Sequence, residues 1–162
     1  MISSEHSATW KIANYLNRLL RPFVNGKTRS TTFSNETDFI RKLTHYAHTE
    51  HRLSSSTIFI TITISNFYSM VSHKTMVDIL SIFLRDNLAR NKLQDISITT
   101  IQNLVQLFLY NNIFRYNENI YTITHGGPNT MALTDTLSNI YLFQCQKMIS
   151  EKVTQNKELF GR

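Results

Sequence analysis

Apolar residues recur at helical spacing in five separate stretches of this 162-residue chain. In the first stretch, Ile12, Leu16, Leu19 and Leu20 follow the i, i+4, i+7, i+8 pattern of a helix that buries one side. We therefore expect a fold built largely from helices with one apolar face each. The predicted helices cover residues 8–22, 35–48, 73–91, 99–112 and 133–147, and the last could extend further.

Two features should separate the first helix from the second. Pro22 lacks a backbone N–H and its ring clashes with the preceding turn, so we expect it to end or bend the helix. The polar segment 24–32 contains Gly26 and is expected to be a loop. Further along, Ser72 stands where a serine side chain would cap the helix predicted over residues 73–91.

One stretch has no helical period and predicts a strand instead. Residues 57–64, "TIFITITI", are β-branched or aromatic at every position. Around Asn117–Asn119, alternating flanks and turn-forming residues predict a β-hairpin over residues 113–124. We therefore predict a fold of the α/β (α+β) class, in which a buried strand and a hairpin form a short β-sheet covered by helices.

The residues with unusual backbone freedom are concentrated at one place. The chain has only four glycines and two prolines, and Gly126, Gly127 and Pro128 are adjacent to one another just before the last predicted helix. No Gly-Lys-Ser/Thr follows, so this turn is not a phosphate-binding P-loop, and it lacks the dinucleotide-binding fingerprint. From its residues alone, a Gly-Gly-Pro turn that opens a helix is usually a purely structural turn.

The charge of the chain is unevenly distributed. Lys and Arg number 17 against 11 Asp and Glu, a formal net charge of +6. Residues 1–52 hold eight of the basic and four of the acidic side chains, and the remainder is nearly balanced. A local basic excess is typical of a surface that binds a polyanion. The alternative is a solvated face that only keeps the protein soluble.

Other features limit the location of the protein. The single cysteine, Cys145, excludes an intrachain disulfide, which suits a reducing compartment. No apolar run approaches the roughly 18 residues of a membrane span, and the N-terminus lacks the order of a secretory signal. We expect an intracellular protein, cytoplasmic or nuclear, without a membrane partner.

The chain carries no recognisable catalytic or metal-binding signature of its own. His45, His48 and His51 follow one another at three-residue spacing, but no cysteine pair or further His-rich segment accompanies them. Surface or core histidines are a better interpretation than a zinc site. Neither a Ser-His-Asp nor a Cys-His arrangement can be argued, so we predict no metal and no cofactor in this chain.

Three segments, taken in order, resemble the reverse transcriptase domain of Penelope-like retroelements. Residues 2–22, "ISSEHSATWKIANYLNRLLRP", are similar to the family's Ser- and Thr-rich stretch and the helix that follows it. Residues 59–80, "FITITISNFYSMVSHKTMVDIL", resemble the first catalytic motif of the palm, in which a strand ends in Asp and an aromatic residue follows. Residues 111–143, "NNIFRYNENIYTITHGGPNTMALTDTLSNIYLF", resemble the hairpin and then the turn and helix that bind template and nucleotide.

The resemblance implies a partial polymerase domain over residues 1–162, related to RNA-directed DNA polymerases. Residues 1–52 would be fingers-like helices and residues 53–162 a palm-like part. In the family, the glycine-rich turn lets the backbone approach the template and the incoming nucleotide. The positions that match this turn and its final asparagine are Gly126, Gly127, Pro128, Asn129 and Asn139.

The chain departs from the family pattern at its catalytic positions. Thr63 stands where the metal-binding Asp belongs, although Tyr68 matches the aromatic nucleotide-gating position. The chain also stops before the aromatic-x-Asp-Asp motif, and Mg²⁺ would be expected only of an intact family member. Polymerases hold two divalent ions with carboxylates, and a neutral hydroxyl cannot supply that charge. We therefore predict a catalytically inactive homologue.

Three interpretations remain open: an inactive fragment of a retroelement enzyme, a domesticated nucleic-acid-binding module, and an unrelated helical interaction domain. If binding persists, it should be weak, sequence-independent contact with RNA or DNA, because phosphate neutralisation needs only clustered cations. The sequence leaves the oligomeric state open. The predicted nucleic-acid-binding residues are Lys11, Arg18 and Arg21 on the first helix, with Lys27 and Arg29 on the following loop.

Overall fold

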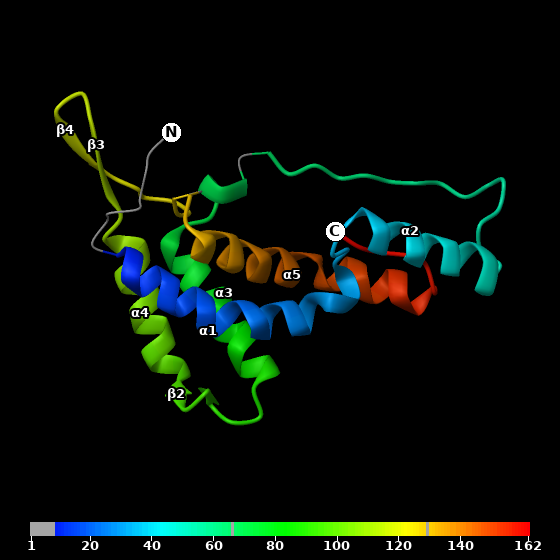
Figure 1. Ribbon diagram of the computed structural model, residues 1–162, viewed down its shortest axis with the longest axis horizontal. Coiled ribbons are helices and arrows are strands. Elements are labelled where there is room, and N and C mark those ends of the chain that lie inside the picture. Colours follow the sequence, from blue (N-terminus) through cyan, green and yellow to red (C-terminus); the bar gives the residue numbers. More distant parts are fainter. Residues whose placement is uncertain (1–8, 66, 129) are drawn as a thin grey trace.

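The computed structural model describes residues 9–65, 67–128 and 130–162. Of Tyr68, within the second range, it describes the backbone only. Most of this part is helical, and the strands form two separate two-stranded antiparallel sheets (Figure 1). A mixed helix-and-strand composition is thus confirmed. The main helices are α1 (Trp10–Thr28), α2 (Glu36–Thr44), α3 (His73–Asn87), α4 (Ile98–Tyr110) and α5 (Ala132–Gln155). The shorter elements are η1 (Arg29–Thr31), η2 (His45–Thr49), η3 (Phe67–Ser69), β1 (Lys92–Leu93), β2 (Ile96–Ser97), β3 (Ile113–Tyr116) and β4 (Asn119–Thr122).

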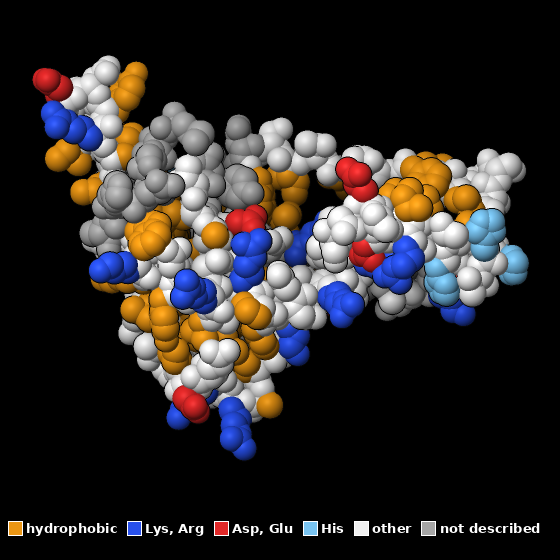
Figure 2. Space-filling model, viewed as in Figure 1, with side chains coloured by type: hydrophobic (Ala, Val, Ile, Leu, Met, Phe, Trp, Pro, Cys, Tyr) orange, Lys and Arg blue, Asp and Glu red, His pale blue; other side chains and the backbone are white. Residues whose placement is uncertain are grey.

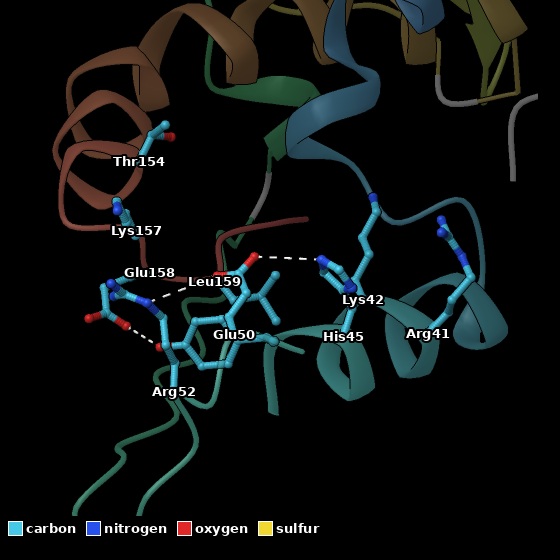
Figure 3. A pocket seen from close by; sticks show the side chains of 10 residues that line it. Arg41, Lys42, His45, Glu50, Arg52, Thr154, Lys157, Glu158 and Leu159 are labelled. Atoms are coloured by element: carbon cyan, nitrogen blue, oxygen red, sulfur yellow. Dashed lines mark hydrogen bonds and ion pairs between the residues drawn. The ribbon is translucent and has the colours of Figure 1, made fainter. Parts of the chain in front are cut away.

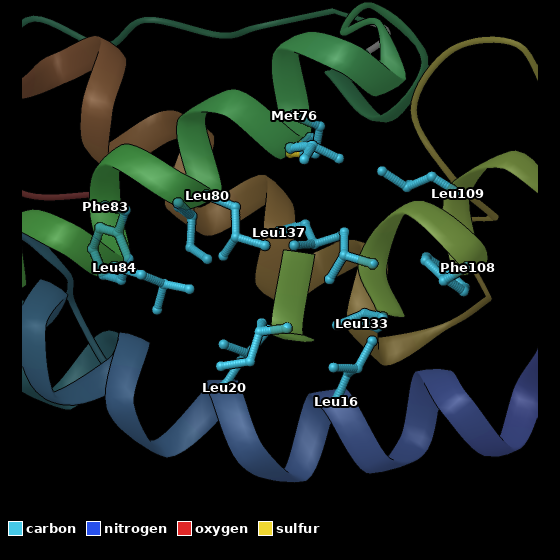
Figure 4. Packing of buried hydrophobic residues seen from close by; sticks show 14 of the residues in the cluster. Leu16, Leu20, Met76, Leu80, Phe83, Leu84, Phe108, Leu109, Leu133 and Leu137 are labelled. Carbon is cyan, nitrogen blue, oxygen red and sulfur yellow. The ribbon is translucent and has the colours of Figure 1, made fainter. Parts of the chain in front are cut away.

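The hydrophobic core lies between α1, α3, α4 and α5. Each of these helices contributes leucine, isoleucine, valine or phenylalanine side chains that water does not reach, and Figure 4 shows them interdigitating. Burial of such side chains is the main favourable contribution to folding. Fully enclosed examples are Leu16 and Leu20 of α1, Leu80 and Phe83 of α3, Phe108 of α4, and Leu137 of α5.

Local signals in the sequence fix where two of the core helices, α3 and α4, begin. The side chain of Ser72 accepts a hydrogen bond from the Thr75 backbone N–H at 3.1 Å, which confirms the predicted cap of α3. Ser97 caps α4 in the same way, through the N–H of Thr100 at 3.0 Å. Both caps satisfy backbone donors that a helix cannot pair internally.

The first helix is longer than predicted. It continues through Pro22 to Thr28, and η1 follows at once, so the prediction of a loop over residues 24–32 was wrong for residues 24–31. Pro22 itself is exposed, and the apolar stripe continues past it, because Val24 and Thr28 are buried. The burial of these side chains offsets the backbone hydrogen bond that a proline inside a helix removes, at a cost of about 3 kcal/mol.

The buried strand predicted over residues 57–64 is absent, and that prediction was wrong. The segment is extended but belongs to no sheet, and Ile58, Ile60 and Ile62 are about four-fifths exposed, at 81%, 81% and 76%. Figure 1 shows it running as a long strap between α2 and η3. The helices enclose a core without it, and no strand edge among the described residues lies beside it to pair with.

The predicted hairpin is confirmed. Strands β3 and β4 pair antiparallel from Ile113↔Thr122 to Tyr116↔Asn119, and the turn residues Asn117 and Glu118 both have positive φ. The hairpin projects from the helical body and most of its side chains are exposed (Figure 1). In the part of the chain that the structure describes, no helix has the length and apolarity needed to cross a membrane.

Candidate nucleic-acid interface

Helix α1 presents a cationic face opposite its buried stripe. The 19-residue helix contains no acidic residue. At 100° per residue, Lys11, Arg18 and Arg21 fall within an arc of about 80°, and all three side chains are exposed. The predicted grouping of these three cations on one face is therefore what the structure shows, and Lys and Arg side chains are visible over α1 in Figure 2.

Within the described part of the chain, one ion pair involves the cations of this face. Arg21 lies 3.8 Å from a carboxylate oxygen of Asp135 on α5, and both side chains are about half exposed. An exposed pair at that distance contributes little. Among the described residues, Lys11 and Arg18 take part in no ion pair. The face can therefore neutralise an incoming anion without first breaking a strong internal contact.

The other two predicted cations do not join this face. Because α1 continues past Pro22, Lys27 lies nine residues beyond Arg18, which places it about 180° away around the helix. Its ammonium group sits 5.8 Å from the centroid of the Phe23 ring and helps line a shallow pocket of about 190 Å³ with Lys147. Arg29 is exposed in η1. Of the five predicted cations, Lys11, Arg18 and Arg21 therefore share one face of α1, and Lys27 and Arg29 lie outside that face.

Two aromatic residues flank the cationic face and were missed in the sequence. Trp10 is 42% exposed and Tyr15 is 49% exposed, although aromatic side chains of this size are usually buried. On the same helical projection they border the arc that holds Lys11, Arg18 and Arg21. That projection could have found them, since neither residue belongs to the apolar stripe. Exposed aromatic rings beside cations suit the stacking of unpaired bases.

The Gly-Gly-Pro turn has a structural explanation in the fold. Gly126 is buried with φ of 63°, a conformation that side chains disfavour, and its N–H donates to the carbonyl of Val71 at 2.7 Å. A Cβ on Gly127 would lie 2.7 Å from the Thr134 hydroxyl oxygen. Pro128 is buried, and its carbonyl accepts from the Met131 N–H at 3.1 Å. The turn fastens the start of α5 against the start of α3.

A buried histidine lies against this turn. His73 opens α3, is 5% exposed, and packs edge-on against Tyr110 with ring centroids 5.0 Å apart. Burial lowers the pKa of its imidazole, and the nearby His125 acts in the same direction, while a hydrogen bond with the Gly126 backbone opposes them. The neutral form of His73 is therefore the one that the folded turn favours.

Of the remaining positions matched to the template turn, the structure describes only Asn139. Asn139 lies within α5, and its backbone carbonyl accepts a hydrogen bond from the Arg162 guanidinium at 3.1 Å. Asn129 lies outside the described residues. No described hydrogen bond joins Asn139 to the turn.

Of the two positions matched to the catalytic strand, the structure describes the side chain of Thr63 only. Thr63 is exposed in the extended segment 57–64 rather than at the end of a sheet strand. Tyr68 falls in η3, and its side chain lies outside the described part of the chain. The described residues include no group of three His, Cys, Asp or Glu side chains that could hold a metal ion.

The three histidines at three-residue spacing lie in and next to η2, at the opposite end of the molecule from the β3–β4 hairpin (Figure 1). Figure 2 shows histidine side chains gathered on the surface near α2. His45, His48 and His51 are all exposed, and the ring of His45 lies 3.7 Å from a carboxylate oxygen of Glu50. They surround no described carboxylate cluster that would complete a metal site.

An open pocket of about 650 Å³ lies between η2 and the end of α5 (Figure 3). Cations line it, but the neighbouring groups already engage most of them. Arg52 donates to the Asn156 carbonyl at 3.0 Å, and Lys42 lies 3.1 Å from Asp38. The Tyr46 hydroxyl donates to Glu158. These interactions connect the end of α5 to η2 and its flanking residues. The pocket therefore offers an anion fewer unpaired cations than the α1 face does.

The α1 face therefore combines cations, exposed aromatic rings and an absence of acidic residues on one helix. This arrangement can bind phosphates and stack bases. Comparison with known proteins finds no matching family model, no matching curated protein and no matching solved structure.

Proposed function

We propose that this chain is a non-catalytic, reverse-transcriptase-like domain that binds single-stranded RNA or DNA without sequence preference along α1. The observation that carries the proposal is the cationic face itself. Lys11, Arg18 and Arg21 stand exposed on a helix that has no acidic residue. Such a surface attracts any polyanion and releases condensed counterions from it.

Single strands fit this face better than a duplex does. Trp10 and Tyr15 border the cations and are close to half exposed. Unpaired bases can stack on such rings, whereas the bases of a duplex are already stacked on each other. From Lys11 to Arg21 the helix rises about 15 Å, so contact would involve a short run of nucleotides. Weak binding is therefore expected.

The absence of catalysis follows from the chemistry of the matched positions. Thr63 offers a neutral hydroxyl where the resembled family has a metal-binding carboxylate. Mg²⁺ requires hard, charged oxygen ligands, and no cluster of carboxylates among the described residues replaces the lost one. The retained property would be attraction to nucleic acid, which needs no metal.

A salt titration tests the proposal. The affinity of labelled oligouridylate is measured by fluorescence anisotropy at several salt concentrations for the wild type and for Lys11→Glu/Arg18→Glu. The matched control is Arg85→Glu/Arg90→Glu, which changes the net charge equally but lies outside α1, at exposed positions. Arg21 is left intact because it contacts Asp135 across the α1–α5 interface.

The expected result is a difference in slope. For single strands the logarithm of affinity falls with the logarithm of salt at about 0.7 per neutralised phosphate, so the α1 variant should lose about 1.4 from its slope. The control should keep the wild-type slope. Equal slopes in the wild type and the α1 variant would reject the α1 face as the binding surface.

A second variant separates stacking from charge. Trp10→Ala removes an exposed ring without changing any charge. It should weaken binding by up to about 1–3 kcal/mol, the contribution of one stacked base, while leaving the salt slope unchanged. Unchanged affinity would show that the ring does not contact the nucleic acid.

A further inference from the structure

Beyond Thr57, the extended segment 57–64 makes no backbone hydrogen bond with any described residue. The N–H of Thr57 donates to the Ser54 carbonyl at 3.1 Å, but among the described residues no backbone hydrogen bond reaches positions 58–64. Their side chains are exposed as well, including four isoleucines and Phe59. A strand with two free edges is a template for pairing with another chain.

The sequence of the segment is complementary to itself. Side chains alternate between the two faces of a strand, so Ile58, Ile60, Ile62 and Ile64 share one face. Two copies paired antiparallel about Thr61 would set Ile58 opposite Ile64 and Ile60 opposite Ile62. Every isoleucine would then face an isoleucine, and cross-strand pairs of β-branched residues stabilise a sheet.

The charge of the chain also favours pairing between copies. The chain has a formal charge of +6, yet no charged residue occurs from Leu53 to Ser72. Two copies can therefore meet along this segment without placing like charges opposite one another, which would destabilise the pair. The segment also lacks proline and glycine, the residues that usually interrupt an edge strand.

We propose that residues 57–64 are a self-association strand, which pairs antiparallel with the same segment of a second copy about a two-fold axis at Thr61. Antiparallel pairing gives a symmetric, self-complementary interface of the kind most homodimers use. An interface of eight residues per copy is at the small end for stable complexes, so association should depend on protein concentration.

Blocking the backbone tests whether the segment pairs at all. Successive N–H groups of a strand point to opposite edges, so Ile60→Pro/Thr61→Pro removes a donor from each edge. Ile60→Val/Thr61→Val is the matched control, because it keeps both donors and the β-branched shape. Positions 60 and 61 make no backbone hydrogen bond in the described part of the chain, so neither variant should alter the helical circular dichroism.

Sedimentation velocity over a range of concentrations gives the outcome. The wild type and the valine control should form dimers or larger assemblies, and the proline variant should require at least about tenfold higher concentration to do so. A wild type that stays monomeric at every concentration would overturn the proposal. Equal association of the proline variant would do the same.

Cysteine cross-linking tests the register. In a Cys145→Ser background, Thr61→Cys would meet its own copy at about 4.5–5.5 Å between Cα atoms, within the range of a disulfide. In the proposed register, position 58 faces position 64 of the second copy, which is six residues from that copy's position 58. The two cysteines of Ile58→Cys would therefore lie about 20 Å apart. Disulfide dimers should therefore form with Thr61→Cys and not with Ile58→Cys. Equal yields from the two variants would contradict the antiparallel register.

Discussion

Replacing Gly127 by alanine should destabilise the junction between α3 and α5. An added Cβ would lie 2.7 Å from the Thr134 hydroxyl oxygen and 3.2 Å from its methyl carbon. Thr134 is 4% exposed in the first turn of α5, so it cannot move aside freely. Overpacking of this kind costs about 1–3 kcal/mol. For a domain of this size, that should lower the melting temperature by about 2–12 °C.

Two further variants make the reasoning specific to this contact. In Gly127→Ala/Thr134→Ala, both crowding atoms are gone and the remaining Cβ contact is an ordinary 3.5 Å, so most of the loss should be recovered. Gly26→Ala is the matched control, because nothing lies within 4 Å of its added Cβ inside α1. It should stabilise the protein by about 0.5–1 kcal/mol, since alanine favours helix over glycine.

Chemical denaturation followed by circular dichroism measures all of these variants. The account predicts opposite signs for the two single glycine substitutions and a favourable coupling between positions 127 and 134. Gly127→Ala with wild-type stability would refute the reasoning. A loss that Thr134→Ala does not relieve would show that the cost arises from the backbone and not from this contact.

Three other results are expected. Leu20→Ala should cost about 2–5 kcal/mol in denaturation, because Leu20 is fully buried in the core, and a loss below 1 kcal/mol would place it outside that core. Burial lowers the pKa of His73, so the unfolded chain binds its proton more readily. Stability should therefore fall as pH drops below the usual histidine pKa of about 6.5, and His73→Gln should reduce this dependence; an identical pH profile would exclude His73 as its source. Primer extension with Mg²⁺ or Mn²⁺ should yield no product above a blank, and incorporation abolished by a Tyr68 substitution would contradict the loss of catalysis.

Helices α1, α3 and α4 could be predicted from periodicity, because each buries a regular apolar stripe. Pro22 misled the prediction for a physical reason. The local penalty of a proline is real, but the burial of Val24, two residues later, and of Thr28 outweighs it. Whether a stripe continues past a proline depends on what packs against it, and that information is not local.

The segment 57–64 shows the opposite failure. Its residues favour an extended conformation, and the structure is indeed extended there. A strand, however, needs a neighbour, and the four core helices bury one another without it. Local pattern could therefore predict the conformation of this segment but not its pairing or its burial.

The candidate site was predictable where helical spacing determines it. Lys11, Arg18 and Arg21 follow from one projection of α1, and the same projection contains Trp10 and Tyr15. Lys27 was predicted to lie on a loop because the helix was expected to end at Pro22. The helix instead continues to Thr28, which places Lys27 on a different face of α1. An error in one helix boundary thus became an error in the site.

Photo-cross-linking tests the central claim, that α1 binds single-stranded nucleic acid, most directly. Oligouridylate containing 4-thiouridine is irradiated with the wild-type protein, and the adducts are located by peptide mass spectrometry. We predict adducts on the peptide that contains Trp10 and Tyr15, and their loss in Lys11→Glu/Arg18→Glu but not in Arg85→Glu/Arg90→Glu. Adducts concentrated elsewhere, or unchanged by the α1 substitutions, would contradict the account.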